Sequence, residues 1–349
     1  MNTLKCRNVN DAFLRGMDLL DSSGHIEETR NGKVITVEDP VTTVYANPNE
    51  RVLFDPDRDA NPFFHFMEGL WMLAGFNDLA TMEYYNKGMR KYSDDGETLW
   101  GAYGWRWRSY FKDPIFKDFA GKDQVRIIID RLKNDPYDRR CVLQMWDAVG
   151  DLGRDGVDVP CNTAIYFKTV HIEGYSPRLD MTVSNRSNDI IWGAYGANVV
   201  HMSMLHEFVA AATGIRMGKY YQVSNNYHAY LDVFEPMREK LLQIDSFDYY
   251  TIKLLINHNP YKLEEVNPYP MVSIDFRDWE ADLIMFFTRK PFEQLDFKDP
   301  FFSDVAAPIQ DAWHLSKKDM KEEALIEIQH CKADDWMEAC FRWLSRRIK

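Results

Sequence analysis

The stretch from residue 160 to residue 230 gathers side chains that together could act on an electron-poor ring. A thiolate can attack such a ring, an amide can hold the anion that forms, and cationic or hydroxyl groups can hold a sugar phosphate. This inventory indicates nucleophilic catalysis on a small phosphorylated molecule. The residues concerned are Cys161, Arg186, Ser187, Asn198, His228 and Tyr230.

Each of these residues also has an ordinary structural explanation. A free cysteine is more often a small buried hydrophobe than a nucleophile, and Cys161 taken alone favours that explanation. Arg186 changes the balance if its guanidinium lies near the thiol, because a nearby cation favours the reactive thiolate. Asn198 could read an imide edge or cap a helix. His228 and Tyr230 would share one face of a strand, as core aromatic residues often do.

Two features upstream of this stretch could also take part. Glu68 stands in an aromatic helical pattern, where a half-buried carboxylate would suit proton transfer or pair with an arginine. Arg139 and Arg140 follow a turn and could clamp a phosphate or form a solvated basic corner. No residue decides the chemistry alone; the order and the chemical types together do.

Composition limits the classes of protein to consider. The chain has 349 residues, 45% of them hydrophobic, and a net charge of −12. That charge argues against broad affinity for nucleic acid, although a few local arginines can still bind one mononucleotide. The odd number of cysteines, the lack of an apolar leader and the absence of a run of about 18 apolar residues predict a cytoplasmic protein with free thiols and no membrane span. No spacing of His and Cys indicates a metal site.

Periodicity predicts the elements that position these residues. We expect one domain over residues 1–349, with a core at about 30–245 and a C-terminal helical extension at about 300–349. Two helices would end the chain, the first with a capping box of Ser316 and Asp319. The pattern favours an α+β fold with a mixed, largely antiparallel sheet and packed helices. Predicted helices are 1–20, 62–74, 123–134, 197–213 and 228–242. Predicted strands include 163–172 and 178–185, which would form a hairpin with its turn at 174–177, and 220–224.

Taken together, the motifs resemble those of the thymidylate synthase superfamily, which includes phage deoxypyrimidine nucleotide hydroxymethylases. The likeness covers roughly Arg30 to Tyr230, with little beyond. It is carried by a helix with a catalytic glutamate, an active-site tyrosine, an arginine pair, a nucleophile motif and a base-reading asparagine. The motifs are Glu68–Gly75, Gly101–Gly104, Arg139–Arg140, Pro160–Cys161, Arg186–Asp189, Asn198 and His228–Tyr230.

The resemblance implies a mechanism and a role for each residue. Cys161 would add to C6 of a pyrimidine, C5 would attack the methylene of 5,10-methylenetetrahydrofolate, and Glu68 would assist proton removal. Asn198 would hold the imide edge, with Tyr103 and Asp189 as further catalytic residues. Folate-side residues would be Asp189, Trp71 and Trp100. Residues expected on the phosphate and sugar are Arg30, Arg139, Arg140, Arg186, Ser187, His228 and Tyr230.

Four departures from the synthase pattern bear on the product. Asn162 follows the nucleophile where synthases usually carry His. The residues at 161–163 and 186–189 favour the hydroxymethylases. The turn from Gly193 to Asn198 is one residue longer. The segment 345–349 is not the apolar tail that closes over folate, so we expect water, rather than hydride, to capture the methylene.

The sequence therefore predicts a dUMP hydroxymethylase that acts as a homodimer, because the arginine pair serves a partner's site in the family. An amide at position 198 matches the O4 and N3–H edge of uracil. Thymidylate synthase and dCMP hydroxymethylase are the alternative enzymes. A non-catalytic nucleotide-binding homologue and a structural or interaction protein are the alternatives from other classes.

Overall fold

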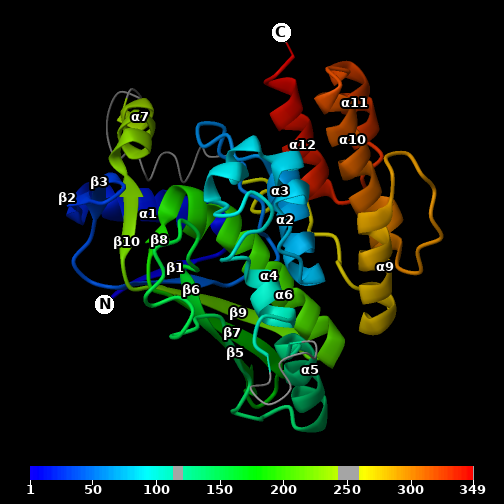
Figure 1. The fold of residues 1–349 in the computed structure, drawn as a ribbon, viewed down its shortest axis with the longest axis horizontal. Coiled ribbons are helices and arrows are strands. Elements are labelled where there is room, and N and C mark those ends of the chain that lie inside the picture. The colour runs from blue at the N-terminus through cyan, green and yellow to red at the C-terminus, as the bar shows by residue number, and fades with distance from the viewer. Residues whose placement is uncertain (113–120, 243–258, 349) are drawn as a thin grey trace.

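A six-stranded mixed sheet forms the floor on which the helices pack in the computed structural model, which describes residues 1–112, 121–242 and 259–348 (Figure 1). The central pair β7–β9 is parallel, and β6 pairs antiparallel with β7, as expected for the predicted hairpin. In spatial order the strands are β1 (Asn2–Cys6), β4 (Val41–Tyr45), β9 (Arg216–Ser224), β7 (Arg178–Asn185), β6 (Asn162–Val170) and β5 (Val142–Gln144).

A second, four-stranded sheet brings distant parts of the sequence together. Its strands pair antiparallel except for β10 and β8, which run parallel. The short strand β8 thereby places Asp189 opposite His228. The strand order is β2 (His25–Thr29), β3 (Gly32–Thr36), β10 (Tyr227–Tyr230) and β8 (Asn188–Asp189).

The two central helices are those that periodicity predicted. Helix α2 (Pro62–Ala74) begins where the Asn61 side chain accepts a hydrogen bond from the Phe64 N–H and ends at Gly75, which has a φ of 77°. Only glycine adopts that left-handed conformation without strain. Helix α6 (Asn198–Thr213) follows η2 (Ile190–Ala197), a distorted turn, and packs against α2.

Shorter helices complete the frame around this pair. Helix α5 (Gln124–Asn134) is capped by the Asp123 side chain, close to the predicted start. Helix α4 (Tyr103–Arg108) begins within the motif Gly101–Gly104. The remaining elements of this region are α3 (Leu79–Tyr85) and η1 (Lys87–Tyr92).

Two predicted helices begin later than expected, each after a strand. Residues 1–20 are not one helix: β1 pairs with β4, and α1 (Val9–Ser23) starts after Asn8, whose side chain accepts hydrogen bonds from two backbone N–H groups. Residues 228–242 divide between β10 and α7 (Leu231–Leu242). In both cases strand pairing with residues far away in the sequence overrides the local helical pattern.

The C-terminal part holds more helices than expected. Ser316 lies in the last turn of α10 rather than at a helix start, and Asp319 has a φ of 62° in the turn that follows, so the predicted capping box is wrong. These elements are α9 (Phe276–Thr288), η3 (Phe302–Ala306), α10 (Ala307–Lys317), α11 (Lys321–Ile328) and α12 (Asp334–Ser345).

Helices α10 and α12 pack against α2, so one hydrophobic core joins both ends of the described chain (Figure 1). Trp336 of α12 meets Phe66 edge to face at 5.1 Å between ring centroids, and Trp343 meets Phe63 at 5.7 Å. Within the described ranges, no helix has both the length and the apolar character that crossing a lipid bilayer requires.

Candidate active site

A cavity of about 320 Å³ opens where α2, the start of α6, the segment before α4 and the loop before β6 converge. Eight of the residues singled out from the sequence line it, although they come from segments more than 100 positions apart. The cavity therefore joins the predicted nucleophile, proton-transfer and base-reading groups. These residues are Glu68, Trp71, Tyr103, Cys161, Ser187, Asp189, Asn198 and Tyr230.

Cys161 sits immediately before β6, at the end of a loop that brings its thiol to the cavity wall. It is half-buried, whereas the other four cysteines are buried, and all five are free thiols. Burial raises the pKa of the Cys161 thiol, and the nearby Arg186 guanidinium opposes that rise. The thiol is therefore accessible from the cavity and beside a cation, as a nucleophile requires.

Arg186 is bound to the loop that carries the nucleophile. Its Nε donates to the carbonyl of Pro160 at 2.9 Å, and its Nη2 donates to the carbonyl of Val159 at 3.0 Å. The backbone N–H of Arg186 also donates to the Cys161 carbonyl at 2.9 Å. These bonds fix Cys161 relative to β7, and the side chain of Arg186 is not among those that line the cavity.

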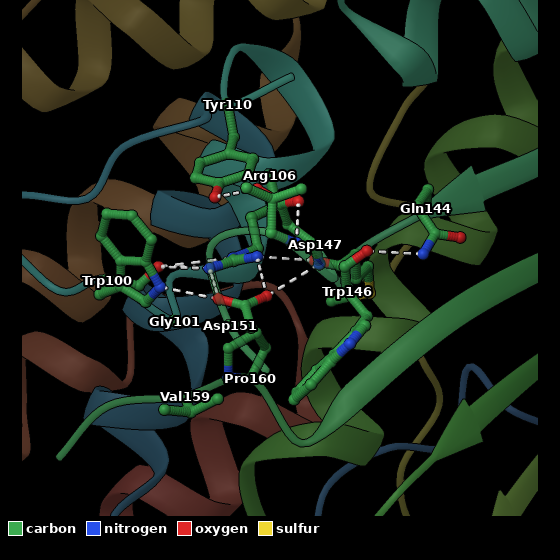
Figure 2. A network of polar contacts seen from close by, with 12 residues as sticks. Trp100, Gly101, Arg106, Tyr110, Gln144, Trp146, Asp147, Asp151, Val159 and Pro160 are labelled. Atoms are coloured by element: carbon green, nitrogen blue, oxygen red, sulfur yellow. Dashed lines mark hydrogen bonds and ion pairs between the residues drawn. The ribbon is translucent and has the colours of Figure 1, made fainter. Parts of the chain in front are cut away.

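A buried ion pair joins the loop before β6 to helix α4 (Figure 2). Arg106 Nη1 lies 2.7 Å from Asp151 Oδ2, and both side chains are fully buried. Trp100 Nε1 donates to Asp151 Oδ1 at 2.8 Å, and Arg106 also donates to the Met145 carbonyl. Trp100, predicted on the folate side, thus belongs to this supporting network and does not line the cavity, unlike Trp71.

Glu68 and His201 form a buried pair at the cavity wall. Glu68 projects from α2, and its Oε2 lies 2.8 Å from His201 Nε2 on α6. The side chains are 8% and 2% exposed. A carboxylate held in this way by an imidazole is fixed in orientation yet borders the cavity, which suits proton transfer to or from a bound molecule.

The amide of Asn198 is oriented by a second asparagine. Asn198 Nδ2 donates to Asn188 Oδ1 at 3.1 Å, and Asn188 Nδ2 donates to Ser224 Oγ at 3.0 Å. Asn198 is the first residue of α6 and lines the cavity. Since Asn198 has a second N–H and a carbonyl oxygen, it can both donate to and accept from a flat ring edge.

Asp189 on β8 lies next to His228 and Tyr230 on the neighbouring strand β10. Asp189 Oδ1 accepts hydrogen bonds from the backbone N–H groups of Ile191 and Trp192, and burial raises the pKa of its carboxyl. The rings of His228 and Tyr230 lie 5.6 Å apart, as the alternation on one strand predicted. Tyr230 lines the cavity, whereas His228 is buried beside it, where burial lowers the pKa of its imidazole.

Tyr103 completes the wall beside the nucleophile. It is the first residue of α4, and its phenol lies close enough to Cys161 for charge on the sulfur to affect the pKa of the hydroxyl. Burial, together with that thiol, raises the pKa of the Tyr103 hydroxyl, so the phenol stays protonated. It can therefore donate a hydrogen bond into the cavity.

Besides Arg186, the other three predicted arginines also lie outside the cavity wall. Arg30 is exposed in the turn between β2 and β3. Arg139 is exposed, and Arg140 pairs with Asp138 at 2.8 Å, with the Arg140 side chain 76% exposed. None of the three is brought to the cavity within this single chain. In the described ranges, no group of three or more His, Cys, Asp or Glu side chains is placed to hold a metal ion.

Three residues in or beside the site were missed from the sequence. His201 lies three positions after Asn198, on the same helical face, which is a signal that could have revealed it. Asn188 precedes Asp189, and nothing in the sequence distinguishes it from an ordinary asparagine in a turn. Asp158 lines the cavity three residues before the nucleophile, in an acidic loop that offers no signal to single out one carboxylate.

Comparison with known proteins agrees with this geometry. The thymidylate synthase family model matches residues 61–281. A deoxyuridylate hydroxymethyltransferase of Pseudomonas phage M6 is 44% identical over 351 residues, which covers 99% of this chain and 95% of that protein. A protein with the same name from Bacillus phage SP01 is 37% identical, covering 58% of this chain and 52% of its own length.

A more distant relative carries the synthase name itself. The thymidylate synthase of Buchnera aphidicola is 27% identical, covering 57% of this chain and 72% of that protein. The likeness to the M6 protein runs past the limit near Tyr230 that the motifs suggested, so the region after residue 245 is matched as well. The alternative of a structural or interaction protein rested on that region being unmatched, so it loses its support. The α+β fold and the family predicted from the motifs are confirmed: the chain belongs to the thymidylate synthase family.

Proposed function

We propose that the chain hydroxymethylates C5 of dUMP, using 5,10-methylenetetrahydrofolate as the one-carbon donor and water as the source of the hydroxyl group. The observation that carries the proposal is that Cys161, Glu68 and Asn198 line one cavity. The name of the M6 relative, which matches almost the whole chain, supports this choice over methylation.

Cys161, Asn198 and Glu68 have different roles in this reaction. The Cys161 thiolate adds to C6 of the ring, which makes C5 nucleophilic towards the methylene carbon of the folate. Asn198, held by Asn188, binds the imide edge and stabilises charge on O4. Glu68 accepts the C5 proton as the folate departs, and His201 keeps its carboxylate in place.

Base preference follows from the same amide. Uracil presents an acceptor at O4 and a donor at N3, and an amide carries both complementary groups. A carboxylate at that position would favour the donor edge of cytosine instead. We therefore propose dUMP rather than dCMP as the substrate, with Trp71 and Asp189 on the folate side of the cavity.

A homodimer would supply the phosphate arginines that this chain does not bring to its own cavity. Arg139 and Arg140 are exposed beside β5, at the edge of the six-stranded sheet. We propose that each protomer lends this pair to its partner's phosphate site, while Ser187 contacts the phosphate within the chain and Arg186 adds its positive charge from beside the cavity. The free cysteines fit a reducing, cytoplasmic setting.

Product analysis tests this function directly. The enzyme is incubated with methylenetetrahydrofolate and either dUMP or dCMP, and the nucleotide products are identified by mass spectrometry. We expect dUMP to gain CH₂O, with Cys161→Ala inactive and the control Cys331→Ala active. A gain of CH₂ with formation of dihydrofolate would identify a thymidylate synthase, and preference for dCMP would refute the Asn198 assignment. A folded protein without turnover on either nucleotide would be a binding homologue.

A further inference from the structure

We propose that Asp158 is the general base that removes a proton from the water molecule that becomes the product's hydroxyl group. This assignment rests on the proposed hydroxymethylation and adds a residue to it. Asp158 lines the same cavity as Cys161, three positions before it in the chain. Nothing in the motif comparison selects this position.

Three carboxyl groups line the cavity, and their hydrogen bonds separate their roles. Glu68 is paired with His201, and Asp189 accepts hydrogen bonds from backbone N–H groups through both oxygens. Asp158 Oδ2 accepts one hydrogen bond, from the Gly101 N–H at 2.7 Å. Among the described residues no donor is bonded to Asp158 Oδ1, so that oxygen is available to a water molecule in the cavity.

The backbone of Gly101 holds this carboxylate in place. A Cβ atom at position 101 would lie 2.5 Å from Asp158 Oδ1, so a larger residue there would displace this carboxylate. Gly101 precedes Tyr103, and both line the cavity with Cys161. The carboxylate is thus held beside the nucleophile by the Gly101 N–H and by close packing on that glycine, as a positioned base requires.

The charges around Asp158 leave it basic. The cations that act on it are Arg106, which is paired with Asp151, and Arg154, which is bonded to Asp94. Asp94 adds a repulsive negative charge. Burial, the largest effect, raises the pKa of the Asp158 carboxyl to about 6. A carboxylate of this pKa is ionised at neutral pH and is a stronger base than an exposed aspartate.

The chemical step balances without a further reactant. After folate leaves, C5 carries an exocyclic methylene and C6 carries the Cys161 sulfur. Asp158 takes a proton from water as the water oxygen bonds to the methylene carbon, and the electron pair moves through C5 to O4. The enolate then restores the C5–C6 double bond and expels the Cys161 thiolate. The product is the hydroxymethyl nucleotide, and the proton remains on Asp158 until solvent removes it.

The test uses Asp158→Asn, which keeps the shape and the hydrogen bond from Gly101, with the exposed Asp155→Asn on the same loop as a matched control. Single-turnover reactions measure release of the C5 hydrogen from dUMP and formation of hydroxymethyl-dUMP. We expect C5 release to stay within a few-fold of wild type and product formation to fall about 10²-fold or more. Mass spectrometry of the quenched variant should show dUMP plus one methylene carbon on Cys161.

The pH profile gives a readout that a purely structural role would not change. In the wild type, the product-forming step should fall as pH drops through about 6, because the protonated carboxyl cannot accept a proton. That acidic limb should disappear in Asp158→Asn. Normal product formation in the variant, or equal loss of C5 release and product, would overturn the assignment. Methyl product from the wild-type enzyme would refute the proposed function itself, a result that is distinct from either.

Discussion

At the scale of single residues, the reactivity of Cys161 depends on opposing effects. Burial raises the pKa of the thiol, while the Arg186 guanidinium lowers it. Arg186 does this while its N–H groups donate to the carbonyls of Val159 and Pro160, so its position is fixed by the loop that it stabilises. One side chain therefore both places the sulfur and favours its thiolate form.

Replacing that cation should make the thiol less acidic. In Arg186→Gln the favourable charge is lost, so the pKa of Cys161 should rise and alkylation by iodoacetamide should require a higher pH. The rate of Cys161 alkylation against pH, followed by mass spectrometry of peptides, measures the midpoint. Arg178→Gln, which removes an arginine paired with Asp180 elsewhere on β7, is the control. An unchanged midpoint in Arg186→Gln would contradict the role given to the guanidinium.

The Glu68–His201 pair makes a separate prediction about proton transfer. Glu68→Gln keeps the size of the side chain but cannot accept the C5 proton, so turnover should fall about 10²–10⁴-fold. Binding of dUMP, measured by calorimetry, should change little, because Asn198 and the phosphate-binding residues are untouched. The exposed Glu97→Gln serves as the control. A loss of dUMP binding as large as the loss of turnover would show that Glu68 binds the nucleotide instead.

At the scale of elements, the loop before β6 depends on the buried pair of Arg106 and Asp151 (Figure 2). Asp151 accepts hydrogen bonds from both Arg106 and Trp100, and also from the Asp147 N–H. A charge buried without its partner is costly. The loop that delivers Cys161 should therefore lose its position when this pair is broken.

We expect Asp151→Asn to lower the free energy of unfolding by about 3–5 kcal/mol, because it leaves the Arg106 charge buried and unpaired. Urea denaturation followed by tryptophan fluorescence measures the loss. Glu83→Gln, which breaks the exposed pair with Arg90, should have little effect. Equal stability of Asp151→Asn and wild type would mean that water reaches Arg106 and that the pair does not hold the loop.

Elements whose signals are local could be predicted from the sequence. The Asn61–Pro62 start and Gly75 end delimit α2, and the alternating residues on either side of Gly174 predict the β6–β7 hairpin. Elements that depend on distant partners could not. Strand β1 forms because it pairs with β4, and β10 because it lies between β3 and β8.

The candidate site shows the same division. Motif order selected Cys161, Glu68 and Asn198, and the structure places all three in one cavity. The hydrogen-bond partners His201 and Asn188 depend on how α2, α6 and β8 pack, which no local pattern encodes.

At the scale of the whole molecule, the C-terminal helices support the site from the far side of α2. Trp343 packs on Phe63 and lies under the Arg347 guanidinium, while Arg346 and Arg347 pair with Asp59. Since α2 also carries Glu68, we propose that residues 1–349 fold as one domain. The helical extension would then contribute to the stability of the catalytic core.

The variant Trp343→Ala tests whether residues 1–349 fold as one domain. We expect a loss of about 3–5 kcal/mol in the free energy of unfolding, with one cooperative transition that fluorescence and activity report together. The exposed Ile326→Ala on α11 should be nearly neutral. Two separated transitions, or a C-terminal fragment released by limited proteolysis while activity persists, would show that the extension is an independent unit.

The proposed homodimer leads to a prediction that only a mixture of two different variants can test. If each protomer lends Arg139 and Arg140 to its partner, the double variant Arg139→Ala/Arg140→Ala and the variant Cys161→Ala should each be inactive alone. In mixed dimers, one site joins an intact Cys161 to an intact arginine pair, so an equimolar mixture should regain about a quarter of wild-type activity.

Mixing Cys161→Ala with Glu68→Gln is the matched control, because both residues line the same protomer's cavity and no complete site can form. Unfolding and refolding the mixtures together allows exchange, and product formation is the readout. Failure of the arginine mixture to regain activity, with dimers present by sedimentation, would show that phosphate binding is confined to one chain and that the exposed arginines form a solvated corner.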